Sequence, residues 1–170
     1  LYRLAGADLT QVDTIGPYTA LQLVAEIGTD MTRWRTEKHF TSWLTLAPKN
    51  KISGARLISS KTQPSASRAA AILRMCAMVA SRTSTALGAY YRRIAYRIGK
   101  PKAITATARK IAILVYRVLR GDLDYRDPGA NAYEANHRTR TLRNLRNRAQ
   151  RLGFGLVNVE TGELLQGLVS

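Results

Sequence analysis

The sequence has little that would support metal or cysteine chemistry. Its single cysteine, Cys76, excludes an internal disulfide framework and a multi-cysteine zinc site. The two histidines, His39 and His137, are far apart in sequence, and no zinc-protease motif, Walker loop or catalytic carboxylate pair is present. The longest apolar run, residues 69–81, is shorter than the ~20 residues that a membrane-spanning helix needs. We therefore predict no metal site and no cofactor in this chain, and no membrane partner.

Acidic residues are missing from a long central part of the chain. Residues 38–120 contain 17 Lys or Arg and no Asp or Glu, whereas soluble surfaces usually interleave both signs. Over the whole chain, 27 basic against 11 acidic residues give a net charge of +16. Such a surface repels itself unless an anion neutralises it, so a polyanionic partner is predicted. The alternative is a basic helical domain without a ligand.

Apolar residues recur mostly at helical spacing. Hydrophobic residues make up 45% of the 170 residues, enough for a core. We predict an all-α fold that begins with a helix-hairpin-helix and ends with an arginine-rich helix, plus a small terminal β-hairpin. Helices are expected over 18–27, 36–48, 65–81, 87–98, 103–119 and 130–152, a basic loop over 49–67, and the β-hairpin within 154–166.

Helix caps and buried faces follow from the same spacing. Thr36 is the expected N-cap of the second helix. The buried stripe of the first helix is predicted at Leu21, Val24, Ala25 and Ile27. The third helix is predicted to bury Ala69, Ile72, Leu73, Cys76 and Val79, and the last helix to align Leu142, Leu145, Ala149 and Leu152.

The segment DTIGPYTALQLVAEIG, residues 13–28, has the pattern of a helix-hairpin-helix. In such a module the hairpin and the next helix N-terminus direct backbone N–H groups at a phosphate without reading base sequence. Gly16, Tyr18 and Thr19 are the candidate DNA contacts. The usual motif has a second glycine where Thr14 stands, and an ordinary helical hairpin packed into the core is the alternative.

The basic loop mixes five serines with cations. A serine hydroxyl becomes nucleophilic when a base or a positive field lowers the cost of its alkoxide, and cations stabilise charge on an attacked phosphorus. A phosphate-gripping loop without chemistry fits the same composition. Ser53 is the sharpest candidate because Gly54 lets a substrate approach closely. The candidate DNA contacts around it are Lys49, Lys51, Gly54, Arg56, Lys61 and Arg68.

Two further basic segments, residues 88–110 and the last helix, are candidates for nucleic-acid binding. Residues 88–110 interleave tyrosines with basic residues, which suits base stacking and phosphate binding, although core tyrosines with solvated cations explain it equally. The last helix suits A-form RNA or a duplex backbone, or is a solvated coiled-coil arm. Candidate contacts to a nucleic-acid backbone are Arg92, Arg93, Lys100, Lys102, Arg143 and Arg146.

Five segments together resemble one known family. They are IGPYTALQLVAEIGTDM, TEKHFTSWLTLAPKNKISG, SASRAAAILR, ALGAYYRR and KPKAITATARKIAILVYR, in this order. They are similar to the C-terminal transposase domain of the insertion-sequence one-ten family, RNA-guided recombinases related to the Piv DNA invertase. The resemblance implies a catalytic serine that becomes covalently linked to DNA, and it selects Ser53 in LAPKNKISG. Related sequences often have a second glycine where Ala55 stands.

The resemblance also implies components outside these residues. Family members carry an N-terminal RuvC-like domain whose four carboxylates bind magnesium, and we expect such a domain upstream of residue 1. The implied partners are double-stranded DNA and a structured guide RNA, with a homo-oligomer acting in the bacterial cytoplasm at the nucleoid.

We divide the chain into three functional parts within one transposase domain. The expected parts are a helix-hairpin-helix over 1–48, a basic loop with the serine and a helical core over 49–121, and an arginine-rich helix with its tail over 122–170. The predicted function is DNA strand cleavage and rejoining through a phosphoserine during transposition. The alternative is a non-catalytic helical module that docks RNA or DNA for a larger assembly.

Overall fold

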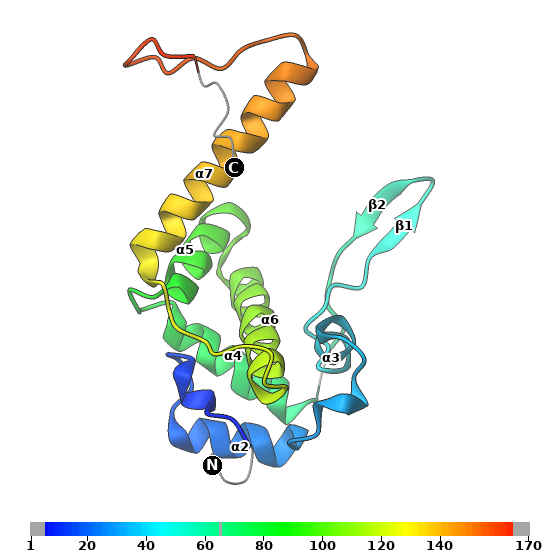
Figure 1. Cartoon of the computed structure of the whole chain (residues 1–170). Coiled ribbons are helices and arrows are strands. Elements are labelled where there is room, and N and C mark those ends of the chain that lie inside the picture. Colours follow the sequence, from blue (N-terminus) through cyan, green and yellow to red (C-terminus); the bar gives the residue numbers. More distant parts are fainter. Residues whose placement is uncertain (1–5, 65, 165–170) are drawn as a thin grey trace. The chain divides into compact units, whose positions relative to one another are not determined.

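The computed structural model describes residues 6–64 and 66–164, and this part of the chain is mostly helical (Figure 1). The all-α prediction is confirmed: the described residues contain six α-helices and one two-stranded antiparallel hairpin. The α-helices are α2 (Pro17–Ile27), α3 (Glu37–Trp43), α4 (Arg68–Ala80), α5 (Ala86–Ile98), α6 (Lys100–Leu119) and α7 (Gly129–Arg151). Two 3-10 turns, η1 (Leu9–Gln11) and η2 (Met31–Arg33), and the strands β1 (Lys51–Ser53) and β2 (Arg56–Ser59) complete the list. None of these helices is both long and apolar enough to cross a bilayer.

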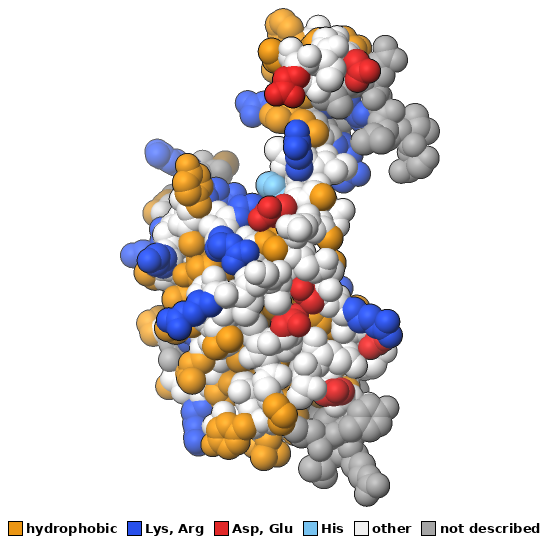
Figure 2. Space-filling view, turned by 90° about the vertical axis from the view of Figure 1, so that its left-hand side faces the viewer, with side chains coloured by type: hydrophobic (Ala, Val, Ile, Leu, Met, Phe, Trp, Pro, Cys, Tyr) orange, Lys and Arg blue, Asp and Glu red, His pale blue; other side chains and the backbone are white. Residues whose placement is uncertain are grey.

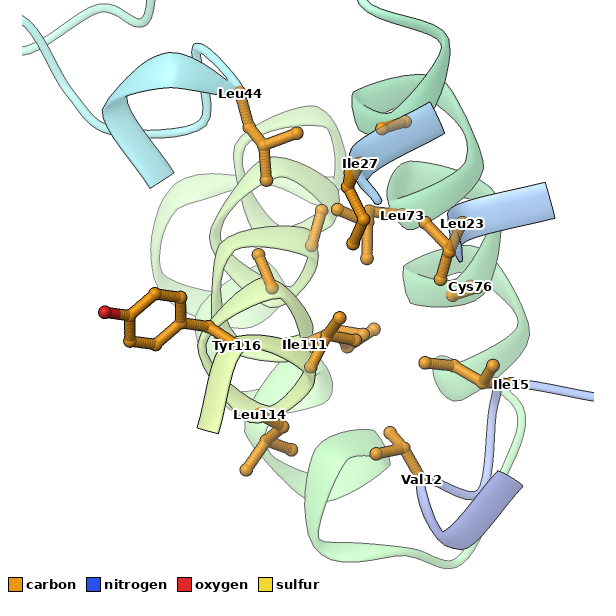
Figure 3. Packing of buried hydrophobic residues seen from close by; sticks show 14 of the residues in the cluster. Val12, Ile15, Leu23, Ile27, Leu44, Leu73, Cys76, Ile111, Leu114 and Tyr116 are labelled. Atoms are coloured by element: carbon orange, nitrogen blue, oxygen red, sulfur yellow. The ribbon is translucent and has the colours of Figure 1, made fainter. Parts of the chain in front are cut away.

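The contacts divide the chain into two compact units, residues 1–130 and 131–170. The core of the first unit lies where α4 and α6 pack together, with α2 against α4, and η1 against α2 and α6. Figure 3 shows Leu23 and Ile27 of α2, Leu73 of α4 and Ile111 of α6 directed into one apolar cluster. Burial of about 25 cal/mol per Å² of apolar surface makes this cluster the main source of stability.

The buried faces of α2 and α4 differ in part from the predicted stripes. In α2, Leu23 and Ile27 are buried, but Leu21 is 49% exposed. In α4, Leu73 is buried as predicted, whereas Val79 is 54% exposed. Both helices are apolar over most of their surface, so periodicity does not single out one face, and packing against η1, α2 and α6 makes the choice.

The helices α5 and α6 form an antiparallel helical hairpin joined at Gly99, which has a φ of +89° and ends α5. The predicted break at this glycine is confirmed. At the other end of α5, Gly88 permits a close approach to the α4–α5 turn. A Cβ atom there would lie 2.2 Å from the backbone oxygen of Thr83, so no larger residue fits.

The segment after α6 ties back to the start of α5. The carboxylate of Asp127 accepts hydrogen bonds from the backbone N–H of Ala86 at 3.0 and 3.2 Å. The same carboxylate accepts from the Tyr125 hydroxyl at 3.1 Å and from the Gly129 N–H at 3.0 Å. Asp127 therefore caps a helix that begins 41 residues earlier.

The second unit consists mainly of α7. No residue of this helix is buried. The terminal β-hairpin is reduced in the described residues to one antiparallel bridge between Val157 and Leu164. The N–H of Asn158 donates to the Glu163 carbonyl at 2.9 Å, and Gly162 turns the chain with a φ of +70°.

Candidate serine site and nucleic-acid interface

The base of the candidate site is anchored by an aromatic cluster, and we call residues 34–47 the root. Phe40 of α3 is fully buried, with its ring 4.9 Å from Trp34 and 5.5 Å from Tyr116 of α6. The Tyr116 hydroxyl donates to the Trp34 carbonyl at 2.8 Å. The predicted cap is confirmed, because the Thr36 side chain accepts from the N–H of His39. The root is therefore fixed to α6 by packing and by hydrogen bonds.

The chain leaves α3 earlier than its sequence suggests. The helix was expected to continue to Pro48, but it ends at Trp43 because Thr45 takes a φ of +57°. The N–H groups of Leu46 and Ala47 then both donate to the Thr41 carbonyl, at 3.0 and 3.2 Å. This tight turn buries Leu46 and points the following residues away from the helix axis.

Residues 48–62 form a hairpin, which we call the arm, where a loop was predicted (Figure 1). An antiparallel bridge joins Pro48 to Thr62, and the N–H of Lys49 donates to the Lys61 carbonyl at 3.0 Å. Above this base, β1 pairs with β2. The apolar residues of this segment are too few and too exposed to mark strands by their periodicity, and backbone pairing forms the arm instead.

The register of the arm brings Ser53 opposite Arg56. Ser53 pairs with Arg56, and Lys51 lies two residues before Ser53 on the same strand. Directly paired residues share a face of a β-ribbon, so Ser53 and Arg56 lie on one side. The register shifts between Lys51 and Ile52, which interrupts the regular pairing at Lys51. The pair Ile52–Leu57 lies on the opposite side. Ser53 therefore lies opposite Arg56 on the paired strand and two residues after Lys51 on its own strand.

The turn of the arm places Ser53 next to its tip. Two residues, Gly54 and Ala55, connect the strands, with φ values of +52° and +62°. Positive φ at both central positions is the requirement of a type I′ turn, which suits the twist of a hairpin. Glycine meets this requirement without strain, whereas Ala55 does not.

The hydroxyl of Ser53 is accessible to a substrate. The residue is exposed, and no residue in the described ranges forms a hydrogen bond with its side chain. The single thiol, that of Cys76, is not available, because burial raises its pKa to about 11. His39 is occupied in the α3 cap, with its Nδ1 atom 2.9 Å from the Thr36 hydroxyl. Ser60 of the same arm is also exposed, so it is the position of Ser53 next to Gly54 and opposite Arg56 that distinguishes it.

The remaining cations of this site lie at the base of the arm and beyond it. Lys49 and Lys61 are exposed and are joined by their backbones. Arg68, the first residue of α4, forms an ion pair with Glu26 of α2 at 3.3 Å. This acidic neighbour reduces the positive field that Arg68 offers to a phosphate.

The segment predicted as a helix-hairpin-helix contains a 3-10 turn followed by one α-helix. Its first element is the 3-10 turn η1, and its second is α2, with Gly16 as N-cap and no side-chain cap. Tyr18 is 71% exposed, and the first N–H groups of α2 have no partner within the helix. Thr14, which replaces the usual glycine, is buried. Its side chain therefore leaves the outer surface of the hairpin clear.

The other predicted contacts lie on separate elements. Arg92 and Arg93 belong to α5, and Lys100 and Lys102 to the first turn of α6. Arg143 and Arg146 belong to α7 in the second unit. Figure 2 shows one face of the molecule, where basic side chains stand at many separate points among hydrophobic ones.

The residues that the structure describes do not form a cluster suited to magnesium. The described residues contain no group of three or more His, Cys, Asp or Glu side chains that could hold a metal ion. The acid-free zone of residues 38–120 surrounds Ser53 in sequence, so carboxylate ligands are not available from neighbouring positions.

Three features of the site were missed by reasoning on the sequence. The type I′ turn of the arm was not predicted, because its two central residues are Gly54-Ala55, whereas the usual sequence signal is Asn-Gly or Asp-Gly. Asp127 is distant in sequence from the helix that it caps. Tyr96 lies in a segment that was selected for its tyrosines, but only the structure shows that its ring is exposed.

Comparison with known proteins gives one match. The family model described as "Transposase IS116/IS110/IS902 family" matches residues 6–92, slightly more than half of the chain. The match includes η1, α2, the root, the arm, α4 and the first half of α5. No curated protein and no solved structure matches the sequence.

Proposed function

The chain belongs to the IS116/IS110/IS902 family of transposases, which implies a role in DNA transposition, and on this premise we propose that Ser53 is the nucleophile that cleaves and rejoins DNA strands. The observation that carries the proposal is the arm itself. It presents an exposed serine opposite Arg56 and two residues after Lys51, next to a tight turn and away from the apolar core.

The proposed reaction is an exchange of phosphate esters. The Oγ atom of Ser53 bonds to a DNA phosphorus while the bond from that phosphorus to one sugar oxygen breaks. The serine hydroxyl loses its proton, and the departing sugar oxygen gains one, so protons balance. One phosphodiester is replaced by another, so the bond energy is retained for attack by a new strand hydroxyl. The cations beside Ser53 stabilise the charge that develops on the phosphoryl oxygens.

We propose that the cations of the arm bind the DNA backbone. Lys49, Lys51, Arg56 and Lys61 supply cations along the arm, and Arg68 adds one at the start of α4. We propose that the N-terminus of α2, with Gly16, Tyr18 and Thr19, holds a further part of the duplex through its backbone N–H groups. These contacts position the duplex and do not read its sequence.

The proposal includes components that this chain does not supply. By resemblance, a structured guide RNA specifies the sequence, and a RuvC-like domain contributes the carboxylates for magnesium. We propose that Arg143 and Arg146 of α7 and the cations of α5 and α6 serve the nucleic-acid backbone in that assembly. The full assembly is proposed to be a homo-oligomer that acts in the cytoplasm, at the nucleoid.

A suicide DNA substrate tests the role of Ser53. A nick placed so that the cleaved end diffuses away traps the phosphoserine, which a denaturing gel detects as protein attached to DNA. We expect the adduct with the full-length protein and its complete loss in Ser53→Ala. Ser60→Ala, an exposed serine of the same arm, is the matched control and should retain the adduct. An adduct that persists in Ser53→Ala contradicts the proposal.

A second candidate function is a non-catalytic nucleic-acid module. It is favoured by one observation: within the described ranges, the Ser53 side chain has no hydrogen-bond partner that could accept its proton. This function predicts no adduct with either protein. It predicts steeply salt-dependent binding, with affinity falling by orders of magnitude between low and moderate salt if about six phosphates are contacted.

A further inference from the structure

The turn between α5 and α6 carries an aromatic ring that has no packing role. Tyr96, in the last turn of α5, is 97% exposed. Its neighbour Tyr91 is buried in a small cluster with Ile94 and Ala103, which holds the two helices together. Because the Tyr96 ring contributes nothing to this cluster, the fold does not explain its presence.

Cations surround Tyr96 in the sequence and on the helix surface. Arg92 and Arg93 precede it by four and three residues, so they share its face of α5. Arg97, Lys100 and Lys102 follow at the turn and in the first turn of α6. In the described part of the chain, no carboxylate is in salt-bridge distance of these last three. The positive field at the turn is therefore not neutralised by the protein.

The two arginines before Tyr96 are held by contacts of their own. The Arg92 Nη1 atom donates to the Thr83 carbonyl at 2.8 Å. The Arg93 guanidinium lies over the ring of Tyr90, 5.7 Å from its centroid. Neither contact involves Tyr96, and the 97% exposure of this residue shows that no side chain covers its ring. The ring face is open to a planar ligand.

We propose that this turn is a stacking site for unpaired nucleic acid. One base stacks on the Tyr96 ring, and the adjoining phosphates lie against Arg97, Lys100 and Lys102. An open aromatic face suits an unpaired base, because bases in a duplex stack on one another and do not present their faces. The inference deepens the proposed function by naming a form of nucleic acid, but it does not depend on covalent chemistry at Ser53. This turn lies beyond the residues that the family model matches.

Binding of two labelled DNA probes tests the inference. The probes are an unpaired thymidine 20-mer and a duplex of equal length, measured by fluorescence anisotropy over a range of salt. Tyr96→Ala should weaken binding of the unpaired probe by about 5- to 150-fold, the measured range for loss of one base–aromatic stack. Tyr96→Phe should bind it within about twofold of the unchanged chain, because the ring remains. Met78→Ala, an exposed apolar residue of α4, is the control.

The salt dependence separates stacking from charge. Tyr96→Ala should leave the slope of log affinity against log salt unchanged, because stacking releases no counterions. Replacing Lys100 and Lys102 by Gln should reduce this slope by about 1.4 for the unpaired probe. An equal loss of duplex and unpaired binding in Tyr96→Ala overturns the inference, as does unchanged binding of both probes. Competition by polyglutamate provides a further check. If polyglutamate displaces the unpaired probe as well as unlabelled DNA does, and Tyr96→Ala abolishes this competition, the site binds an acidic protein partner and the inference is overturned.

The outcome is independent of the serine reaction. If binding of the unpaired probe does not depend on Tyr96 while the Ser53 adduct still forms, the inference is overturned and the proposed function stands. Stacking without an adduct supports the inference and contradicts the proposed function. The test of each proposal therefore has its own readout.

Discussion

The root and the arm are adjacent in sequence but differ in how they are stabilised. In the root, Phe40, Leu44 and Leu46 are almost fully buried and contact a helix that follows much later in the chain. In the arm, Ile52 and Leu57 remain exposed, and the strands pair only with each other. An isolated two-stranded hairpin is marginally stable in water. The fold therefore concentrates its stability at the root and leaves the candidate nucleophile on a segment that adds little to it.

Because of this difference, the residues that stabilise the fold are not the residues proposed to react with DNA. Substitutions in the arm should alter nucleic-acid binding or the reaction while the helical core stays folded. Substitutions in the root should unfold the protein before any specific effect on the arm can be seen. A hairpin fixed only at its base also retains the freedom to follow a DNA strand, as strand exchange would require.

The largest effect is expected from truncation of Phe40 at the root. Phe40→Ala leaves a cavity among Trp34, Trp43 and Tyr116 and should reduce the free energy of unfolding by about 3–5 kcal/mol. Urea unfolding followed by circular dichroism measures this loss. Ile52→Ala in the arm, where the side chain is exposed, should change it by less than about 0.5 kcal/mol. Similar losses in both variants would contradict the separation of root and arm.

Thiol labelling should also distinguish the core from the arm. Burial raises the pKa of Cys76 to about 11, so its reactive thiolate is scarce near pH 8 and becomes common only as the pH rises toward this value. We expect Cys76 to react at least about 100-fold more slowly in the native protein than in urea. In Ser60→Cys, the added thiol on the exposed arm should react in a separate fast phase. A fast reaction of Cys76 in the native protein would show that the core opens.

A smaller effect is expected at Asp127, which joins the chain after α6 to the start of α5. Asp127→Ala leaves the first N–H of α5 without this acceptor and should cost about 1–2 kcal/mol in thermal or urea unfolding. Asp124→Ala is the control, because Asp124 is exposed and makes only a long ion pair with Arg126 at 3.8 Å. A loss in the control as large as that in Asp127→Ala would argue against the cap.

The same substitution should alter the titration of Asp13. Partial burial, and then the negative charge of Asp127, raise the pKa of the Asp13 carboxyl. A raised carboxyl pKa favours the protonated form in the folded state, so this contribution to stability is present at low pH and is lost as pH rises through the folded pKa. Asp127→Ala should lower the pKa of Asp13, which NMR titration of the carboxyl carbon detects. An unchanged pKa would indicate that desolvation alone causes the shift.

The smallest effect is expected at the turn of the arm. Ala55→Gly removes the strain of a positive φ and should stabilise the hairpin locally by about 1 kcal/mol or less. Because the arm hardly packs on the core, global unfolding should stay unchanged, whereas amide exchange in β1 and β2 should slow. Gly54→Ala is the opposite change and should speed exchange. Slower exchange in Gly54→Ala would exclude the type I′ turn.

The helix positions were largely predictable from local signals. The break at Gly99 and the cap at Thr36 lie where their residue types indicate, because caps and glycines act through the nearest backbone groups. The arm was not predictable in the same way. Its strands have few apolar residues and an alanine where the turn needs positive φ, so residues 49–67 have the composition of a loop. The candidate Ser53 was selected by resemblance, and its placement opposite Arg56 came from strand pairing.

The sequence alone determined the charge of this protein and the positions of most helices, because charge adds up along the chain and helix signals act over a few residues. Tertiary structure decided which faces of α2 and α4 are buried, because both helices are apolar on more than one side. It also decided that Asp127 caps α5 and that Tyr96 remains uncovered. The cap depends on a contact between residues far apart in sequence, and the exposure of Tyr96 depends on no other part of the fold covering it. Neither can be read from neighbouring residues alone.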